Sequence, residues 1–276
     1  MSLEKLRAFN TKESVAKREY LRADVLPIFA TVEDLERVSE KNIDVLNELI
    51  NTSDYIDYYG KKEEKEKINA NFHPDNPYII SEVNNKTKYS SRYKDCQGIV
   101  VSGKGVGGEE ISFIAHYSPY TFSNKEYFES FTQHLQSSIH KLQALTEQHT
   151  IDAVTMGGQY GKGEFAMSEL DPDTEKRDEY VVIKEVVDDL VFQELGFRPL
   201  IAEGPNTTAS PSTTNKDSEH YQSLLYDTPH RHLHILIRGA TTNSGKSFSL
   251  DTIEEQRPEL EQIAEREYKD IRSQHG

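Results

Sequence analysis

The chain of 276 residues contains one cysteine, no tryptophan, and 32 lysines and arginines against 47 aspartates and glutamates. A lone cysteine, Cys96, cannot close an internal disulfide, so the fold does not depend on oxidation, which suits a reducing compartment. The net charge of −15 and the lack of a clustered basic stripe argue against nucleic acid or an anionic membrane as main partner, because both need cationic counter-charge. No apolar run approaches the roughly twenty residues of a membrane span, and the charged N-terminus does not resemble a secretory segment. We therefore expect a soluble protein of cytoplasmic type.

The pattern of charged and apolar residues changes twice along the chain. Residues 1–77 are highly charged with a helical apolar stripe, which predicts a helical N-terminal extension. Residues 78–239 alternate short β-type runs with amphipathic segments, which predicts the core. Residues 240–276 contain Pro258 at a helix start and predict a helical tail. The expected fold class is α/β (α+β), with a central β-sandwich or mixed sheet flanked by helices and helical extensions at both termini.

The first half of the core predicts a hairpin followed by a helix. Gln97–Ser102 and Ile111–His116 are apolar, β-branched runs around the glycine-rich turn Gly103–Gly108. After it, Ser123 and Glu126 form a capping box that opens a helix expected to reach residue 148. That helix should pack on the hairpin.

The second half predicts a strand, a helix, a strand and a closing hairpin. A helix over 179–195 should end at Gly196, because a glycine suits the left-handed position after a helix. Residues 204–220 have no apolar period and are typical of a surface loop. The expected strands are Ile151–Met156, Leu200–Ala202, Ser223–Tyr226 and His232–Arg238.

Two glycine-rich segments resemble nucleotide-binding loops but lack the required context. Gly103–Gly108 matches G-x-G-x-x-G, yet a strand follows it where the pyrophosphate would need the N-terminus of a helix. Gly239–Ser247 resembles a phosphate loop, but its first glycine is one residue out of register and too little chain follows for the Mg²⁺-binding aspartate. We expect no cofactor.

Three alternating histidines, His230, His232 and His234, would share one face of a strand, where two imidazoles can bind one metal ion. The alternative is the outward polar face of an edge strand. No Asp, Glu or Cys stands at a matching offset to supply a further ligand, which favours the polar face.

Cys96 and His116 form the stronger pair. A thiol becomes a nucleophile as thiolate, and an imidazole within hydrogen-bond reach takes its proton and later delivers one to the leaving group. Cys96 lies at a strand start and His116 at the end of the hairpin partner, so the ladder can bring them together. A packed cysteine beside an unrelated histidine remains the alternative.

The stretch from Ser90 through Cys96 is followed by a strand, a glycine-rich turn and Phe113–His116. This order resembles the chemoreceptor glutamine deamidase CheD, whose pattern is a Thr, Gly-Ser-Cys, a strand and Ala-His. The likeness continues through Gly157-Gly158, the helix 179–195, "GFRPLIAEGPN" and the closing hairpin "LLYDTPHRHLHILIRG". It covers roughly residues 85–239. The sequence departs from the family at Lys94-Asp95, where Gly-Ser is usual, and at Gly204-Pro205-Asn206.

The resemblance implies a cysteine-dependent protein glutamine deamidase, a hydrolase that acts on a side-chain amide of a protein substrate. Similar folds carry the catalytic domains of cytotoxic necrotizing factor toxins, so a toxin-like effector delivered into another cell is included in the expectation. Cys96 would be the nucleophile and His116 the general base. Ser90 would orient the imidazole, with Thr87 or a main-chain carbonyl as alternatives. The other functions considered are an inactive relative that binds a protein partner and a metal site at the three histidines; the oligomeric state is open.

Overall fold

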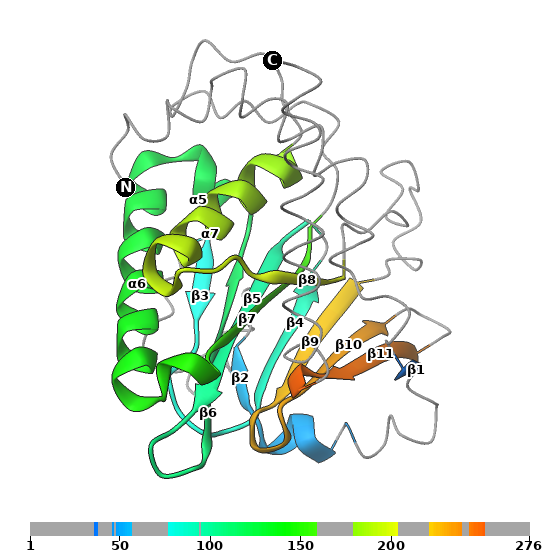
Figure 1. Ribbon diagram of the computed structural model, residues 1–276. Coiled ribbons are helices and arrows are strands. Elements are labelled where there is room, and N and C mark those ends of the chain that lie inside the picture. Colours follow the sequence, from blue (N-terminus) through cyan, green and yellow to red (C-terminus); the bar gives the residue numbers. More distant parts are fainter. Residues whose placement is uncertain are drawn as a thin grey trace, which may run out of the picture.

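The computed structural model describes residues 36–37, 46, 48–56, 77–93, 95–158, 179–203, 221–238 and 243–251. These residues build two sheets and a layer of helices (Figure 1). Sheet A has six strands in the order β1 (Glu36–Arg37), β11 (Asn243–Ser249), β10 (His232–Arg238), β9 (Tyr221–Asp227), β4 (Lys88–Tyr93), β2 (Asp54–Ile56). Sheet B has five in the order β3 (Tyr78–Ile80), β6 (Glu110–Tyr117), β5 (Gln97–Lys104), β7 (Asp152–Gly157), β8 (Leu200–Glu203). The expected α+β architecture with sheets flanked by helices is confirmed at this level.

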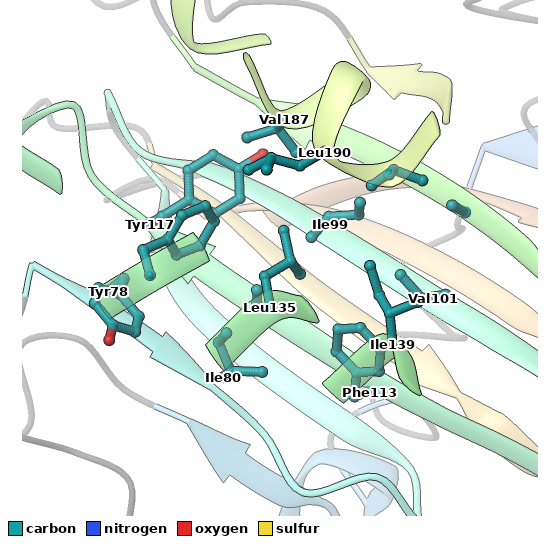
Figure 2. Close-up of a cluster of buried hydrophobic side chains, with 14 of the residues drawn as sticks. Tyr78, Ile80, Ile99, Val101, Phe113, Tyr117, Leu135, Ile139, Val187 and Leu190 are labelled. Carbon is teal, nitrogen blue, oxygen red and sulfur yellow. The ribbon is translucent and has the colours of Figure 1, made fainter. Parts of the chain in front are cut away.

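Two long helices cover one face of sheet B. Helices α6 (Lys125–Leu145) and α7 (Glu179–Leu195) lie side by side along it, and the short helix α5 (Tyr120–Ser123) precedes α6 (Figure 1). Alternate residues of β5 and β6 point toward these helices because side chains alternate across a strand. Figure 2 shows the resulting core; its labelled members are Tyr78, Ile80, Ile99, Val101, Phe113, Tyr117, Leu135, Ile139, Val187 and Leu190.

The opposite face of sheet B packs on sheet A to form a sandwich. The interior between the sheets is a second apolar cluster with members from both: Ile79, Tyr93, Cys96, Val100, Ile114, Val154, Met156, Leu200, Ala202, Leu224, Tyr226, Leu233, Ile235 and Leu250. Burial of this much apolar surface is the main stabilising term for such a layer arrangement. The candidate catalytic residues lie in this interior.

A buried ion network also joins the two sheets. Arg231, in the turn between β9 and β10, donates from Nη1 to Glu110 Oε1 at 2.9 Å and from Nη2 to Asp152 Oδ2 at 2.9 Å. Ser102 Oγ donates to the same Glu110 oxygen at 2.5 Å. Arg231 adopts the left-handed conformation with φ 53°. Burial raises the pKa of Glu110, and the nearby arginine opposes that rise.

The expected core elements agree closely with the structure. The hairpin around the glycine-rich turn is β5–β6, the closing hairpin is β9–β10, and α7 spans Glu179–Leu195 before Gly196 at φ +81°. The prediction that Ser123 caps α6 was wrong. The cap of α6 is Asn124, whose Oδ1 accepts from the N–H groups of Glu126 and Tyr127, whereas Ser123 ends α5.

The terminal extensions are less purely helical than expected. Within 1–77, residues 46 and 48–52 are helical, but β1 and β2 are strands of sheet A. Within 240–276, β11 pairs with β10 along its whole length, so this part of the expected helical tail is a strand. Residue 204–220, Pro258 and most of both extensions lie outside the described residues. Within the described parts of the chain, no helix combines the length and apolar character needed to span a membrane.

Candidate functional site

Cys96 and His116 share the inner face of sheet B at one end of the sandwich. Cys96 immediately precedes β5, and His116 is the next-to-last residue of β6. The register pairs His116 with Gly98, two residues after Cys96. Because residues two apart point to the same side of a strand, the thiol and the imidazole belong to one face and are diagonal neighbours. The sequence expectation that the ladder brings them together therefore agrees with the register.

Ser90 provides the hydrogen-bond partner of the imidazole from the opposite sheet. Its Oγ lies 2.9 Å from His116 Nδ1, and both residues are fully buried. If Nδ1 carries the ring proton and donates to Ser90, Nε2 is left with a lone pair, the tautomer that a general base requires. Thr87, the alternative orienting group, instead donates to Asp227 Oδ1 at 3.4 Å.

Tyr93, the last residue of β4, holds the other side of the imidazole. Its ring is stacked on that of His116, with centroids 4.0 Å apart and planes 15° apart. The ring occupies the space above Gly98, where an added Cβ would lie 2.8 Å from Tyr93 Cε1. A glycine at this place in β5 therefore lets an aromatic ring from sheet A reach the histidine of sheet B.

The Gly157-Gly158 turn fixes the backbone of Cys96. The N–H of Gly158 donates to the carbonyl of Cys96 at 2.8 Å, and Gly157 has φ +79°, a conformation that favours glycine. A Cβ at Gly157 would lie 2.9 Å from the same carbonyl, 3.6 Å from Tyr93 Cδ1 and 3.8 Å from Gln222 Oε1. The main chain beside the thiol is thus enclosed by β7, β4 and β9.

Burial controls the protonation of the site. Both Cys96 and His116 have no exposed surface. Burial lowers the pKa of His116 to about 3, so the imidazole is neutral at pH 7 and its protonated form is disfavoured. The thiol of Cys96 donates to Asp95 Oδ1 at 3.7 Å. A substrate can reach the sulfur only after the residues that cover it move.

The three histidines do not form the expected common face. His230 lies in the 3₁₀ turn η5 (Thr228–His230), where its Nδ1 is 2.8 Å from Asp227 Oδ2. His232 and His234 do share a face of β10, with ring centroids 5.8 Å apart. β10 lies between β9 and β11, so it is not an edge strand. Among the residues that the structure describes, no three His, Cys, Asp or Glu side chains are grouped to hold a metal ion.

Neither glycine-rich segment meets the requirements of a phosphate site. Gly105 N–H donates to Glu109 O at 2.6 Å within the tight turn between β5 and β6. Gly245 and Ser247, from the second segment, are paired residues of β11 with β10. The first segment therefore leads into β6, and the described part of the second, residues 243–247, belongs to β11, whereas a phosphate loop precedes a helix.

Sequence analysis missed Tyr93, Gly98 and Gln222 as parts of this site. A glycine inside an apolar β-type run signals a close approach of another group, so Gly98 carried a usable signal. Tyr93 and Gln222 carried none, because their role follows from the pairing of β4 with β9, in which they are opposite each other.

No family model matches this sequence. A search of curated proteins finds no match either. The geometry of the buried Ser90, His116 and Cys96 is therefore the basis on which a function is argued.

Proposed function

We propose that this protein is a cysteine-dependent glutamine deamidase that hydrolyses the side-chain amide of a protein substrate. The observation that carries the proposal is the hydrogen bond between Ser90 Oγ and His116 Nδ1, on the sheet face that His116 shares with Cys96. A hydroxyl, an imidazole and a thiol form, in that order, the orienting group, the base and the nucleophile of thiol acyl transfer.

The first half of the proposed reaction forms a thioester. His116 Nε2 takes the thiol proton, and Cys96 Sγ attacks the carboxamide carbon of the substrate glutamine. The tetrahedral intermediate collapses when the C–N bond breaks, and His116 gives the proton to the departing ammonia. Backbone N–H groups near Cys96 would stabilise the oxyanion.

Water completes the reaction. His116 takes a proton from a water molecule, whose oxygen attacks the thioester carbonyl; the C–S bond breaks and the proton returns to the sulfur. The products are a glutamate side chain, ammonia and the free thiol. No metal or organic cofactor takes part in these steps. Because the thiol must be reduced, the reaction suits a reducing compartment, in the producing cell or in a cell that receives the protein.

The resemblance to CheD supports the same assignment. That family places a Thr where Ser90 stands, and the sandwich with two helices on one face has the order of elements on which the resemblance rests. Lys94-Asp95 is one of the points at which the chain departs from that family, and Asp95 contributes a carboxylate near the sulfur. A like charge beside a thiolate disfavours its formation, so substrate binding must displace or neutralise this carboxylate.

Mass spectrometry of candidate partner proteins tests the proposal. A glutamine converted to glutamate gains about 1 Da, and this gain should occur with the wild type and not with Cys96→Ser or His116→Ala. Thr87→Ala is a matched control, because it removes a hydroxyl from the same strand region without touching His116. Conversion that persists in Cys96→Ser excludes the mechanism.

A second candidate function is an inactive relative that binds a protein partner. The complete burial of Cys96 and His116 favours it, because a packed thiol needs no path for substrate. Alkylation of the native protein separates the two. Labelling of Cys96 by iodoacetamide that is lost in His116→Ala supports the deamidase, and labelling only after denaturation supports the binding module.

A further inference from the structure

Gln222 is the second residue of β9 and points into the sandwich beside the backbone of Cys96. It pairs with Tyr93 across the β4–β9 ladder. Its Oε1, the carbonyl oxygen of Cys96 and the Tyr93 ring all lie within 4 Å of one point beside Gly157. The side chain thus reaches the part of the interior where the thiol is held.

The amide oxygen of Gln222 is buried without a hydrogen-bond partner among the described residues. The residue is 6% exposed, and Oε1 accepts no hydrogen bond there. Buried polar atoms are nearly always paired, because an unpaired one loses its hydration with nothing in return. Glutamine is also an uncommon residue for an interior whose cluster is made mostly of apolar side chains.

The hydrogen-bonding capacity of Gln222 Oε1 matches the carboxamide NH₂ group of the proposed substrate. The side-chain oxygen of Gln222 can accept a hydrogen bond and cannot donate one. The primary amide of a substrate glutamine carries two N–H donors, on the nitrogen that leaves in deamidation. The product carboxylate has no donor at that position. An acceptor placed here would bind glutamine and not glutamate.

We propose that Gln222 is a specificity-determining residue, whose Oε1 accepts a hydrogen bond from the N–H of the substrate carboxamide while Cys96 attacks its carbon. The inference rests on the proposed deamidase function and deepens it, because it selects primary amides over esters, N,N-disubstituted amides and the acid product. A site built to hydrogen-bond a substrate N–H rejects analogues that lack it, since the acceptor would stay buried and unpaired.

Two small thiol reagents test the inference without a known protein substrate. Iodoacetamide has a primary amide with two N–H donors. In N,N-dimethyl-2-iodoacetamide both of these hydrogens are replaced by methyl groups. For Cys96, the rate with iodoacetamide is divided by the rate with the dimethyl reagent, and this quotient is divided by the same quotient for glutathione. The result, the normalised ratio, measures the selection for N–H. One hydrogen bond predicts a normalised ratio of about ten for the wild type.

Two variants locate the source of that selection. Gln222→Met has a side chain of similar length and no acceptor, so its normalised ratio should fall to about one, the value that defines glutathione. Gln222→Glu keeps an acceptor oxygen and should retain the preference for iodoacetamide. Methyl methanethiosulfonate, which has no amide, should modify Cys96 of the wild type and of Gln222→Met at similar rates.

The outcomes distinguish the two proposals. A wild-type ratio equal to that of glutathione, with a reactive thiol, overturns the role of Gln222 and leaves the deamidase function standing. A selective ratio that persists in Gln222→Met also overturns it. A native thiol that is inert to all three reagents overturns both, and the wild-type measurement decides this even if Gln222→Met fails to fold.

Discussion

The imidazole of His116 lies flat against the ring of Tyr93, at 4.0 Å between centroids, although the two residues belong to different sheets. Ser90, three residues before Tyr93 on the same strand, binds Nδ1 of that imidazole. One strand of sheet A therefore fixes both the plane and the hydrogen bonding of a histidine that sheet B supplies.

Gly98→Ala should destabilise the protein by about 1–3 kcal/mol, the usual cost of overpacking a filled core. The new methyl group would lie 2.8–3.0 Å from three atoms of the Tyr93 side chain, so the ring must leave its position on His116. Urea denaturation measures the loss. In a Tyr93→Leu background the same substitution should cost clearly less, because the ring is gone; equal costs in both backgrounds would show that the two residues are not coupled.

Ser90→Ala should reduce the alkylation rate of native Cys96 by about tenfold, the effect of about 1.4 kcal/mol. The variant removes the hydroxyl that orients the imidazole, while Ser90→Thr keeps it and should retain most of the rate. The measurement is iodoacetamide labelling followed by peptide mass spectrometry. A Ser90→Ala protein that is folded and labels at the wild-type rate contradicts an orienting role.

Stability should fall as the pH is lowered from 6.5 toward 3. The pKa of His116 is lowered from 6.5 to about 3 in the folded protein, so in this window the unfolded chain binds a proton that the folded chain does not. The stabilisation is complete above pH 6.5, and about 2 kcal/mol of it is lost at a pH of about 5. His116→Gln should reduce this loss in urea denaturation at pH 7.5 and 5.

A matched control separates this effect from the removal of any histidine. The side chain of His149 is 80% exposed, so His149→Gln removes a histidine without changing the core and serves as the control. His234 contributes with the same sign, since burial lowers its pKa to about 4. An unchanged pH dependence in His116→Gln would mean that its imidazole is not buried neutral.

Arg231→Met should destabilise the protein by about 3–5 kcal/mol, the usual cost of breaking a buried ion pair. The substitution takes the cation away from Glu110 and Asp152 between the sheets. Replacing all three, as Arg231→Met with Glu110→Gln and Asp152→Asn, should recover much of the loss, because neither buried carboxylate of this network remains. Thermal denaturation at pH 7.5 measures both, and a triple variant as unstable as the single one would show that charge is not the cause.

Patterns in the sequence predicted the parts of the fold that local side chains determine. Helix α7 and the hairpins β5–β6 and β9–β10 have strong apolar periods with glycine or proline at their ends, and the structure agrees with them. β11 was missed because Asn243–Ser249 contains few apolar residues, so its strand conformation depends on backbone pairing with β10. The cap of α6 was missed because Ser123 and Asn124 are both good capping residues, and only geometry chooses between them.

The candidate site was predictable within one hairpin and not beyond it. Cys96 and His116 could be placed on neighbouring strands because the turn between them fixes the register of β5 and β6. Ser90 entered through a family resemblance, and its catalytic role stays a prediction. Tyr93 and Gln222 depend on the packing of sheet A against sheet B, which no local pattern encodes.

The β5–β6 ladder has eight residue pairs, from Gln97 opposite Tyr117 to Lys104 opposite Glu110. The hairpin loop lies beyond the last pair, at the far end from the sulfur. Changes in the length and composition of this loop therefore leave the site at the other end of the ladder in place. New termini, a fluorescent tag or an inserted recognition domain can be introduced there while the thiol and the imidazole keep their alignment.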